Sequence, residues 1–236
     1  MNRPFSVLAS HDTSGGPAGR PALHADVAGT AYVEQVSAEH RKSHGLYLTP
    51  PEVADFMAAH AMPSGRLVKV LDPAAGAGIL VCAMVEALVR RPDAPARIEV
   101  TAYEIDPELA QVLTQVLAEL TTWAARQGTD VVATVENRDF VLACAPALET
   151  EAGLFPHLKP ADAFDVVIAN PPYFKLNKAD PRAQAAAAVV HGQPNIYGLF
   201  MAIAAAALKP GGTLMFITPR SFASGPYFRR FREHFF

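Results

Sequence analysis

The sequence predicts an α/β fold, a doubly wound Rossmann-like parallel sheet with helices on both faces. Strand-like and helix-like segments alternate along the chain, and an early strand runs into a glycine-rich turn. A later apolar run, 164–169, stops at Asn-Pro-Pro-Tyr, where the prolines cannot continue a central strand. We expect the strand order 3-2-1-4-5, which places the glycine turn and the Asn-Pro-Pro-Tyr edge in one crevice at the topological switch point.

Net charge, cysteine content and apolar run lengths limit the kinds of function that the sequence supports. The chain has 236 residues, half of them hydrophobic, and a net charge of -3, so any nucleic-acid contact would have to come from a local basic patch or a missing part. Cys82 and Cys144 lack metal-ligand spacing, which indicates reduced thiols and no metal site. Neither a signal pattern nor a membrane-length apolar run is present, so we expect a cytoplasmic protein without membrane contact.

Local composition divides the chain into three predicted parts. They are a flexible segment 1–25, a helical segment 26–62 and an α/β domain 63–236. Within the second part, a helix is expected over 27–40, and basic residues then lead to a glycine stop at Gly45. A further helix is expected over 52–61, where Thr49 can cap the start and Pro51 can occupy the first turn.

The α/β domain is predicted element by element from apolar runs and turn signals. The expected strands are 67–72, 98–103, 131–135, 164–169 and 213–218. The expected helices are 79–89, 107–126 and 195–208. The run 166–169 shows no polar alternation, as in a strand that is buried on both faces. The polar, alanine-rich run 175–194 predicts a mobile loop beside the Asn-Pro-Pro-Tyr edge.

The turn after the first strand carries a ligand-binding signal. Gly76 and Gly78 allow a ligand to approach the backbone closely, and the alanines between them keep the space open. The spacing is not the full G-x-G-x-x-G, and the Gly-Lys-Ser/Thr of a triphosphate loop is absent. We therefore favour an adenosine ligand without phosphates, while a tight strand-to-helix connection is the alternative.

Acidic residues follow the second and third strands. Glu104 can accept both hydroxyls of a ribose, or it can complement a helix dipole. Asp106 directly precedes a proline and fits a helix cap better than Glu104 does. Asp139 can accept a hydrogen bond from an adenine amine or cap the next helix.

The Asn-Pro-Pro-Tyr segment suits a planar ligand with an exocyclic amine. Asn170 offers a carbonyl oxygen, Pro171 offers a second carbonyl, and Tyr173 offers a flat ring behind two stiff prolines. The lone pair of such an amine is delocalised, so accepting its two hydrogens makes the nitrogen more electron-rich. S-adenosylmethionine in the glycine-turn pocket would supply a methyl electrophile, without a strong base or a metal.

These motifs resemble the adenine-N6 DNA methyltransferases of restriction–modification systems, in the group whose methionine-side motif precedes the glycine motif. The resemblance covers about residues 43–230, including a fifth-strand segment at 216–222. It implies an S-adenosylmethionine site made by Tyr47, Thr49, Pro50, Asp72, Ala74, Gly76, Gly78, Glu104 and Asp139. It also implies that a target adenine, flipped out of double-stranded DNA, is held by Asn170, Pro171, Pro172 and Tyr173.

The sequence departs from that family at its end. The family sheet has seven strands and precedes a target-recognition domain, whereas this chain stops after the fifth strand. We therefore expect a fragment or truncated product that needs a missing recognition domain or a separate specificity subunit. Whether it acts alone stays open. Three arginines in the tail can contact phosphates or form a solvated helix face; they are Arg229, Arg230 and Arg232.

Two alternative functions share part of this pattern. Asn-Pro-Pro-Tyr also occurs in enzymes that methylate a glutamine amide in release factors or a guanine amine in ribosomal RNA. The upstream segment 47–50 favours DNA, because those enzymes usually carry a different N-terminal domain. The second alternative is a non-catalytic module that binds the cofactor and acts as a subunit.

Overall fold

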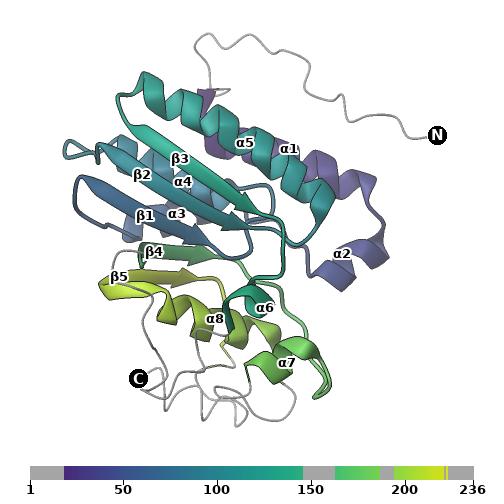
Figure 1. Cartoon of the computed structure of the whole chain (residues 1–236). Helices are drawn as coiled ribbons and strands as arrows, with labels where there is room; N and C mark the ends of the chain where they lie inside the picture. Colours follow the sequence, from purple (N-terminus) through teal and green to yellow (C-terminus); the bar gives the residue numbers. More distant parts are fainter. Residues whose placement is uncertain (1–18, 146–162, 187–193, 221, 223–236) are drawn as a thin grey trace.

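A computed structural model describes residues 19–145, 163–186, 194–220 and 222 of the chain. Its sheet has five parallel strands in the order β3-β2-β1-β4-β5, as the sequence predicts (Figure 1). The strands are β1 (Leu67–Asp72), β2 (Arg97–Tyr103), β3 (Asp130–Glu136), β4 (Phe164–Ala169) and β5 (Leu208–Phe216).

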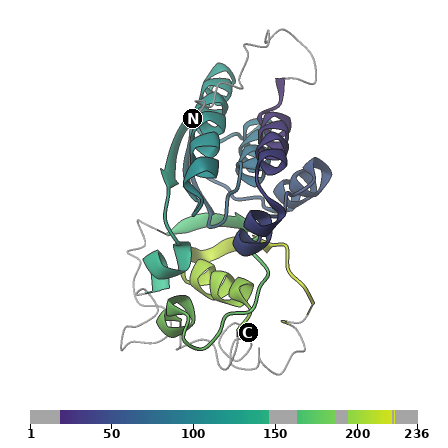
Figure 2. The ribbon, with the colours of Figure 1, turned by 90° about the vertical axis from the view of Figure 1, so that its right-hand side faces the viewer.

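Helices cover both faces of this sheet (Figure 2). On one face α4 (Ile79–Val89) and α5 (Pro107–Arg126) pack against the strands, with α1 (Pro21–Gln35) and α3 (Pro51–His60) outside them. The other face carries α6 (Phe140–Cys144), α7 (Pro181–Ala185) and α8 (Ile196–Ala206), and α2 (Ala38–His44) lies near the carboxyl ends of the strands.

Alternate residues of the central strands belong to two separate hydrophobic cores, one on each face of the sheet. Val70 and Val166 pack into the core under α4 and α5, whereas Leu71 and Val167 pack into the core with α8. All four side chains are almost fully buried. Burial on both faces explains the lack of polar alternation in these strands, and the predicted doubly wound architecture is confirmed.

Helix α1 starts inside the segment 1–25, where the sequence predicted no regular structure. It has no side-chain cap of its own, but the Ala22 N–H donates to Oε1 of buried Glu86 at 2.8 Å. Arg20 pairs with Oε2 of the same carboxylate at 2.8 Å. The helix start is therefore set by a residue of α4, which no local pattern reveals.

The helix expected over 27–40 is two helices. The hydroxyl of Ser37 accepts from the His40 N–H at 3.0 Å and so caps α2 separately. Helix α2 ends as predicted, with basic residues in its last turn and Gly45 in a left-handed conformation at φ +60°. Serine capping at this point explains why α1 does not continue.

Two predictions near the second core are wrong. The fifth strand begins at Leu208 rather than at Thr213, because Leu208 pairs with Phe164 and a register shift follows before pairing resumes at Val166. Within the predicted loop 175–194, Leu176 is buried and α7 forms. Predictions for 1–18, 187–193, Arg229, Arg230 and Arg232 concern residues outside the described part.

Candidate active site

A cavity of about 240 Å³ opens at the carboxyl edge of the sheet. The glycine turn, the ends of β2 and β4, and the start of α6 contribute to its walls. Residues 45–50, which we call the strap, contribute another wall through residues 45–47. A second cavity of about 40 Å³ shares Leu46, Tyr47, Ala74, Gly76 and Asn170 with the first. The predicted crevice at the switch point is therefore present.

The glycine turn is anchored to the neighbouring strand. The Ala75 N–H donates to the Tyr103 carbonyl at 2.9 Å. Gly76 has φ +56° and no atom within 4 Å of the position that a Cβ would take, so its backbone faces open space in the cavity. Gly78 has φ +93°, and a Cβ there would lie 2.8 Å from Leu113 of α5. Thus Gly76 faces a ligand space, whereas Gly78 packs against a helix.

Glu104 joins the turn to the end of β2. Its Oε2 accepts from the Gly76 N–H at 3.0 Å and its Oε1 accepts from the Asp106 N–H at 2.8 Å. The side chain lines the cavity although the residue is only 9% exposed. Burial raises the pKa of the Glu104 carboxyl to about 7. Each carboxylate oxygen keeps a further lone pair with which it can accept a hydroxyl.

Asp72, at the end of β1, lacks one hydrogen-bond partner. Its Oδ1 accepts from the Ala74 N–H at 3.1 Å, while Oδ2 is buried with no partner among the described residues. Burial raises the pKa of the Asp72 carboxyl to about 8. This carboxyl therefore holds a proton at neutral pH, at the strand end that leads into the glycine turn.

Asp72→Asn is expected to stabilise the ligand-free protein above pH 8 by about 1–3 kcal/mol and to change little near pH 5. The raised pKa means that the folded state holds a proton which the unfolded state loses as the pH rises, so wild-type stability falls toward pH 8. An amide is neutral throughout and avoids this loss. Urea unfolding at both pH values measures the difference.

Asp93→Asn is the control, because Asp93 is exposed beside Arg91 and the hydrogen bond from Arg91 lowers the pKa of its carboxyl. This variant should not gain stability at high pH. An equal loss of stability by Asp72→Asn at both pH values would contradict the assigned role of burial.

The strap contacts the Asn-Pro-Pro-Tyr segment directly. The Nδ2 of Asn170 donates to Thr49 Oγ1 at 3.1 Å and lies 3.4 Å from the Tyr47 carbonyl oxygen. Thr49 is 4% exposed, whereas Tyr47 is 63% exposed. A Cβ on Gly45 would lie 2.6 Å from the Cβ of Pro172, so the strap approaches this segment as closely as a glycine permits.

Gly45→Ala is expected to displace the strap and weaken binding of a ligand in the cavity by about tenfold, through a 1–3 kcal/mol strain. The physical reason is the combination of φ +60° with the contact to Pro172. Calorimetric titration with S-adenosylmethionine measures the effect. Gly128→Ala is the matched control, since Gly128 has φ +85° and open space around its Cβ position. Equal loss of affinity in both variants would rule out the Pro172 contact as the cause.

Tyr173 closes over Asn170. Its hydroxyl lies 2.5 Å from Asn170 Oδ1 and 2.7 Å from the Ile217 carbonyl oxygen, so its single proton serves these two acceptors alternately. Burial raises the pKa of Tyr173 to about 12, which keeps the hydroxyl protonated. The carbonyl oxygen that we expected to meet a ligand amine thus already accepts from Tyr173, and its second lone pair is left for a further donor.

The far end of the cavity holds Asp139. This residue caps α6, accepting from the Leu142 N–H at 3.0 Å, and its other oxygen lies 3.8 Å from a guanidinium nitrogen of Arg182. Arg182 also pairs with Asp180 at 2.8 Å and lies over the Phe174 ring. The capping alternative is therefore observed for Asp139, and its position in the cavity wall leaves a ligand contact compatible with it.

The predicted site residues fall into three groups. Those lining the large cavity are Tyr47, Ala74, Gly76, Glu104, Asp139, Asn170 and Pro172. Thr49 lines the small cavity only. Residues lining neither cavity are Pro50, Asp72, Gly78, Pro171 and Tyr173. Other wall residues, which no motif indicated, include His44, Tyr103, Arg138, Phe140, Phe174, Arg182, Ile196 and Phe200.

The missed wall residues differ in how far the sequence could have revealed them. Phe140 directly follows Asp139, so its place next to a motif was a usable signal. Arg182 lies in a run without periodicity, and only folding of α7 brings it to the cavity. In the part of the chain that the structure describes, no helix has both the length and the apolar character to span a bilayer.

A family model described as Eco57I restriction-modification methylase matches residues 101–236. Among curated relatives, the type II methyltransferase M.BsuBI of Bacillus subtilis is 30% identical over 198 residues, covering 83% of this chain and 38% of that protein. The type II methyltransferase M.PstI of Providencia stuartii is also 30% identical, over 193 residues, covering 82% of this chain and 36% of that protein. The chain thus spans under two fifths of the length of these relatives.

Solved structures support the fold. The DrdV–DNA complex, determined by electron cryomicroscopy, matches with a TM-score of 0.63 at 19% identity, covering 94% of this chain and 25% of that chain. At this level of identity the likeness concerns the fold alone. Together with the strand order, it gives the Rossmann-like sheet of S-adenosylmethionine-dependent methyltransferases.

Proposed function

Because this chain belongs to the Eco57I restriction-modification methylase family, we propose that it transfers a methyl group from S-adenosylmethionine to the N6 amine of a flipped adenine in double-stranded DNA. The observation that carries the proposal is the meeting of the glycine turn, Glu104 and Asn170 around one cavity. The cofactor is expected on the β1 and β2 side of this cavity, and the target base on the β4 side. The proposed reaction needs no metal.

The residues of the cavity fit an adenosine cofactor. Gly76 leaves open space for close approach, and Glu104 presents a buried carboxylate that can accept hydroxyl hydrogens. Asp139 and Phe140 provide an acidic and an aromatic wall that suit a purine. The strap, with Tyr47 and Thr49, is then expected beside the methionine part. When bound, S-adenosylmethionine supplies a methyl group on a sulfonium.

The residues near Asn170 are expected to orient the accepting amine. The carbonyl oxygens of Asn170 and Pro171 would accept its two hydrogens, which concentrates the lone pair on nitrogen and points it at the methyl group. Asn170 Oδ1 would use the lone pair that does not accept from the Tyr173 hydroxyl, and the Tyr173 ring would stack on the base. The amine loses one proton to solvent after transfer, so positioning rather than strong base catalysis supplies the rate.

Adenine is favoured over the other acceptors with the same chemistry. The strap precedes the glycine turn in the sequence, and Thr49 of the strap accepts a hydrogen bond from Asn170. This agrees with the motif order of the adenine methyltransferases that the sequence resembles. Unstacking a base costs a few kcal/mol, and DNA contacts of a longer protein or of a specificity subunit would offset this cost. We further propose that residues 26–62 serve as the methionine-side segment and that 63–236 form the catalytic domain.

The experiment is methyl transfer from isotopically labelled S-adenosylmethionine to genomic DNA that lacks the cognate modification. Digested nucleosides are separated, and the label is expected in N6-methyladenine. Label in a cytosine product would contradict adenine specificity. Parallel reactions with ribosomal RNA and with total protein test the guanine and glutamine alternatives. Cofactor binding measured by calorimetry, without transfer to any acceptor, would favour the non-catalytic module.

A further inference from the structure

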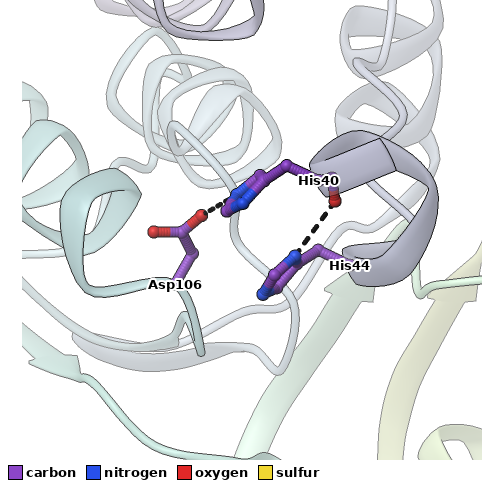
Figure 3. Close-up of side chains that lie close together, drawn as sticks. All are labelled: His40, His44 and Asp106. Carbon is purple, nitrogen blue, oxygen red and sulfur yellow. Dashed lines mark hydrogen bonds and ion pairs between the residues drawn. The ribbon is translucent and has the colours of Figure 1, made fainter. Parts of the chain in front are cut away.

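We propose a site for one divalent transition-metal ion, of the kind exemplified by Zn²⁺, at His40, His44 and Asp106 (Figure 3). The three side chains have no assigned step in the proposed methyl transfer, although His44 and Asp106 also line the large cavity. The ion would join α2, which leads into the strap, to the start of α5.

The donor set has the composition that such ions prefer. Two imidazoles lie four residues apart on α2, so they project from the same side of the helix. The carboxylate of Asp106 reaches them from the turn between β2 and α5. Two histidine nitrogens and one carboxylate oxygen form a known set of zinc ligands, with the remaining position left to water.

The ligand atoms are already close together. One candidate ligand atom from each of the three residues lies within 4.8 Å of the other two. His40 Nε2 is 2.6 Å from Asp106 Oδ2, and two ligands on a tetrahedral zinc ion lie about 3.3 Å apart. His40 Nε2 and Asp106 Oδ2 therefore have to separate by less than about 1 Å. The exposed side chain of His44, in the last turn of α2, would rotate toward them. The metal replaces the proton shared by His40 and Asp106, which passes to water.

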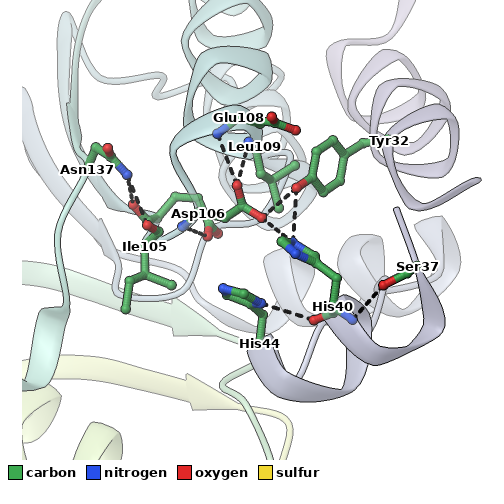
Figure 4. A network of polar contacts seen from close by, with 10 residues as sticks. Tyr32, Ser37, His40, His44, Ile105, Asp106, Glu108, Leu109 and Asn137 are labelled. Atoms are coloured by element: carbon green, nitrogen blue, oxygen red, sulfur yellow. Dashed lines mark hydrogen bonds and ion pairs between the residues drawn. The ribbon is translucent and has the colours of Figure 1, made fainter. Parts of the chain in front are cut away.

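A second layer of hydrogen bonds holds the ligands (Figure 4). Asp106 Oδ1 accepts from the Glu108 N–H at 3.0 Å, and its Oδ2 accepts from the Tyr32 hydroxyl. His44 Nδ1 lies 3.0 Å from the His40 carbonyl oxygen, which directs Nε2 to the metal. Such outer contacts orient metal ligands and strengthen binding.

The electrostatics also suit a cation. The carboxylate of Asp106 is only 5% exposed in its side chain and accepts hydrogen bonds from the Tyr32 hydroxyl and the Glu108 N–H. A cation placed beside it gains from this negative charge more than it would at a solvated surface.

The test is a titration of the full chain, freed of any affinity tag, with Zn²⁺ in a calorimeter and with Co²⁺ in a visible spectrometer. We expect about one ion per chain and a Co²⁺ spectrum with the intensity of a four-coordinate site. His44→Ala should weaken Zn²⁺ binding about 100-fold or more, because it removes a ligand and leaves the His40–Asp106 pair intact.

His60→Ala is the matched control. His60 Nδ1 lies 2.7 Å from the Phe56 carbonyl oxygen, the same contact to residue i−4 that His44 makes, but on α3. This variant should bind Zn²⁺ as the wild type does. His44→Cys keeps a zinc ligand and should retain binding, with a sulfur-to-cobalt absorption band.

Three results would overturn the proposal: no Zn²⁺ binding by the wild type, unchanged binding by His44→Ala, or equal weakening in His60→Ala. Circular dichroism accompanies each titration. Asp106→Asn provides a further check, because asparagine can still cap α5 while it lacks the anionic ligand, so this variant is expected to fold and to bind Zn²⁺ at least tenfold more weakly.

Discussion

Asn170→Ala is expected to slow methyl transfer by about 10³-fold in any preparation of the protein that methylates DNA, while S-adenosylmethionine affinity stays within about fivefold. The proposed role of its carbonyl oxygen is to accept a hydrogen of the target amine, which alanine cannot do. The smaller effect on affinity reflects the loss of a neutral hydrogen bond from Nδ2 to Thr49 in the strap. Single-turnover rates and calorimetric titrations measure the two quantities.

Thr49→Val is the matched control for Asn170→Ala. Valine has nearly the shape of threonine and removes only the hydroxyl that accepts from Asn170 Nδ2. It should change cofactor affinity about as much as Asn170→Ala does, yet leave the transfer rate within about tenfold. Equal loss of rate and affinity in Asn170→Ala would show that Asn170 supports the strap rather than the reacting amine.

Glu104→Gln is expected to weaken S-adenosylmethionine binding by about 100-fold. In the proposed complex the carboxylate accepts ribose hydroxyls, and hydrogen bonds to a charged acceptor contribute about 1.5–3 kcal/mol. The amide also replaces one of the two oxygens that now accept from Gly76 and Asp106. Calorimetry at pH 8 provides the measurement, and unfolding curves check that the turn remains folded.

The pH dependence of cofactor affinity separates the effect of the negative charge of Glu104 from the effect of replacing one of its oxygens. Because burial raises the pKa of Glu104 to about 7 in the ligand-free protein, its carboxylate form, which the cofactor needs, is a minority species at pH 6. Wild-type affinity should rise about tenfold between pH 6 and pH 8 and then level off. Glu104→Gln should lack this rise. A wild-type affinity that falls across the same interval would refute the ribose role.

Patterns along the chain were sufficient for the strand order of the sheet and for part of the cavity wall. The apolar strand 164–169 and the glycine turn are local signals, and the rules of parallel sheets place them side by side. The start of α1 was missed because it depends on Glu86, a residue of another helix. Arg182 was missed for the same reason, since its partner Asp139 is remote in sequence.

The hydrogen bonds of Tyr173 could not be predicted from the sequence for a different reason. Its type and place in the motif indicated a stacking ring, and the sequence could not show that its hydroxyl is shared between Asn170 and Ile217. This contact depends on the pairing of β5 with β4, which brings Ile217 next to Ala169 and which strand bounds alone do not give. Residue type alone shows that Tyr173 offers a ring and a hydroxyl. Which group the hydroxyl contacts depends on the tertiary structure, because Ile217 comes from a neighbouring strand end.

The position of Asn170 links the binding of the two proposed ligands, the cofactor and the target base. One side of its amide holds the strap beside the expected cofactor space, and the other side is held by Tyr173 beside the expected base space. If a cofactor shifts the strap, it changes the freedom of Asn170 to meet a base. Thermodynamic linkage then requires that the base change cofactor affinity by the same factor. A single side chain would therefore couple the two proposed ligands, the cofactor and the target base.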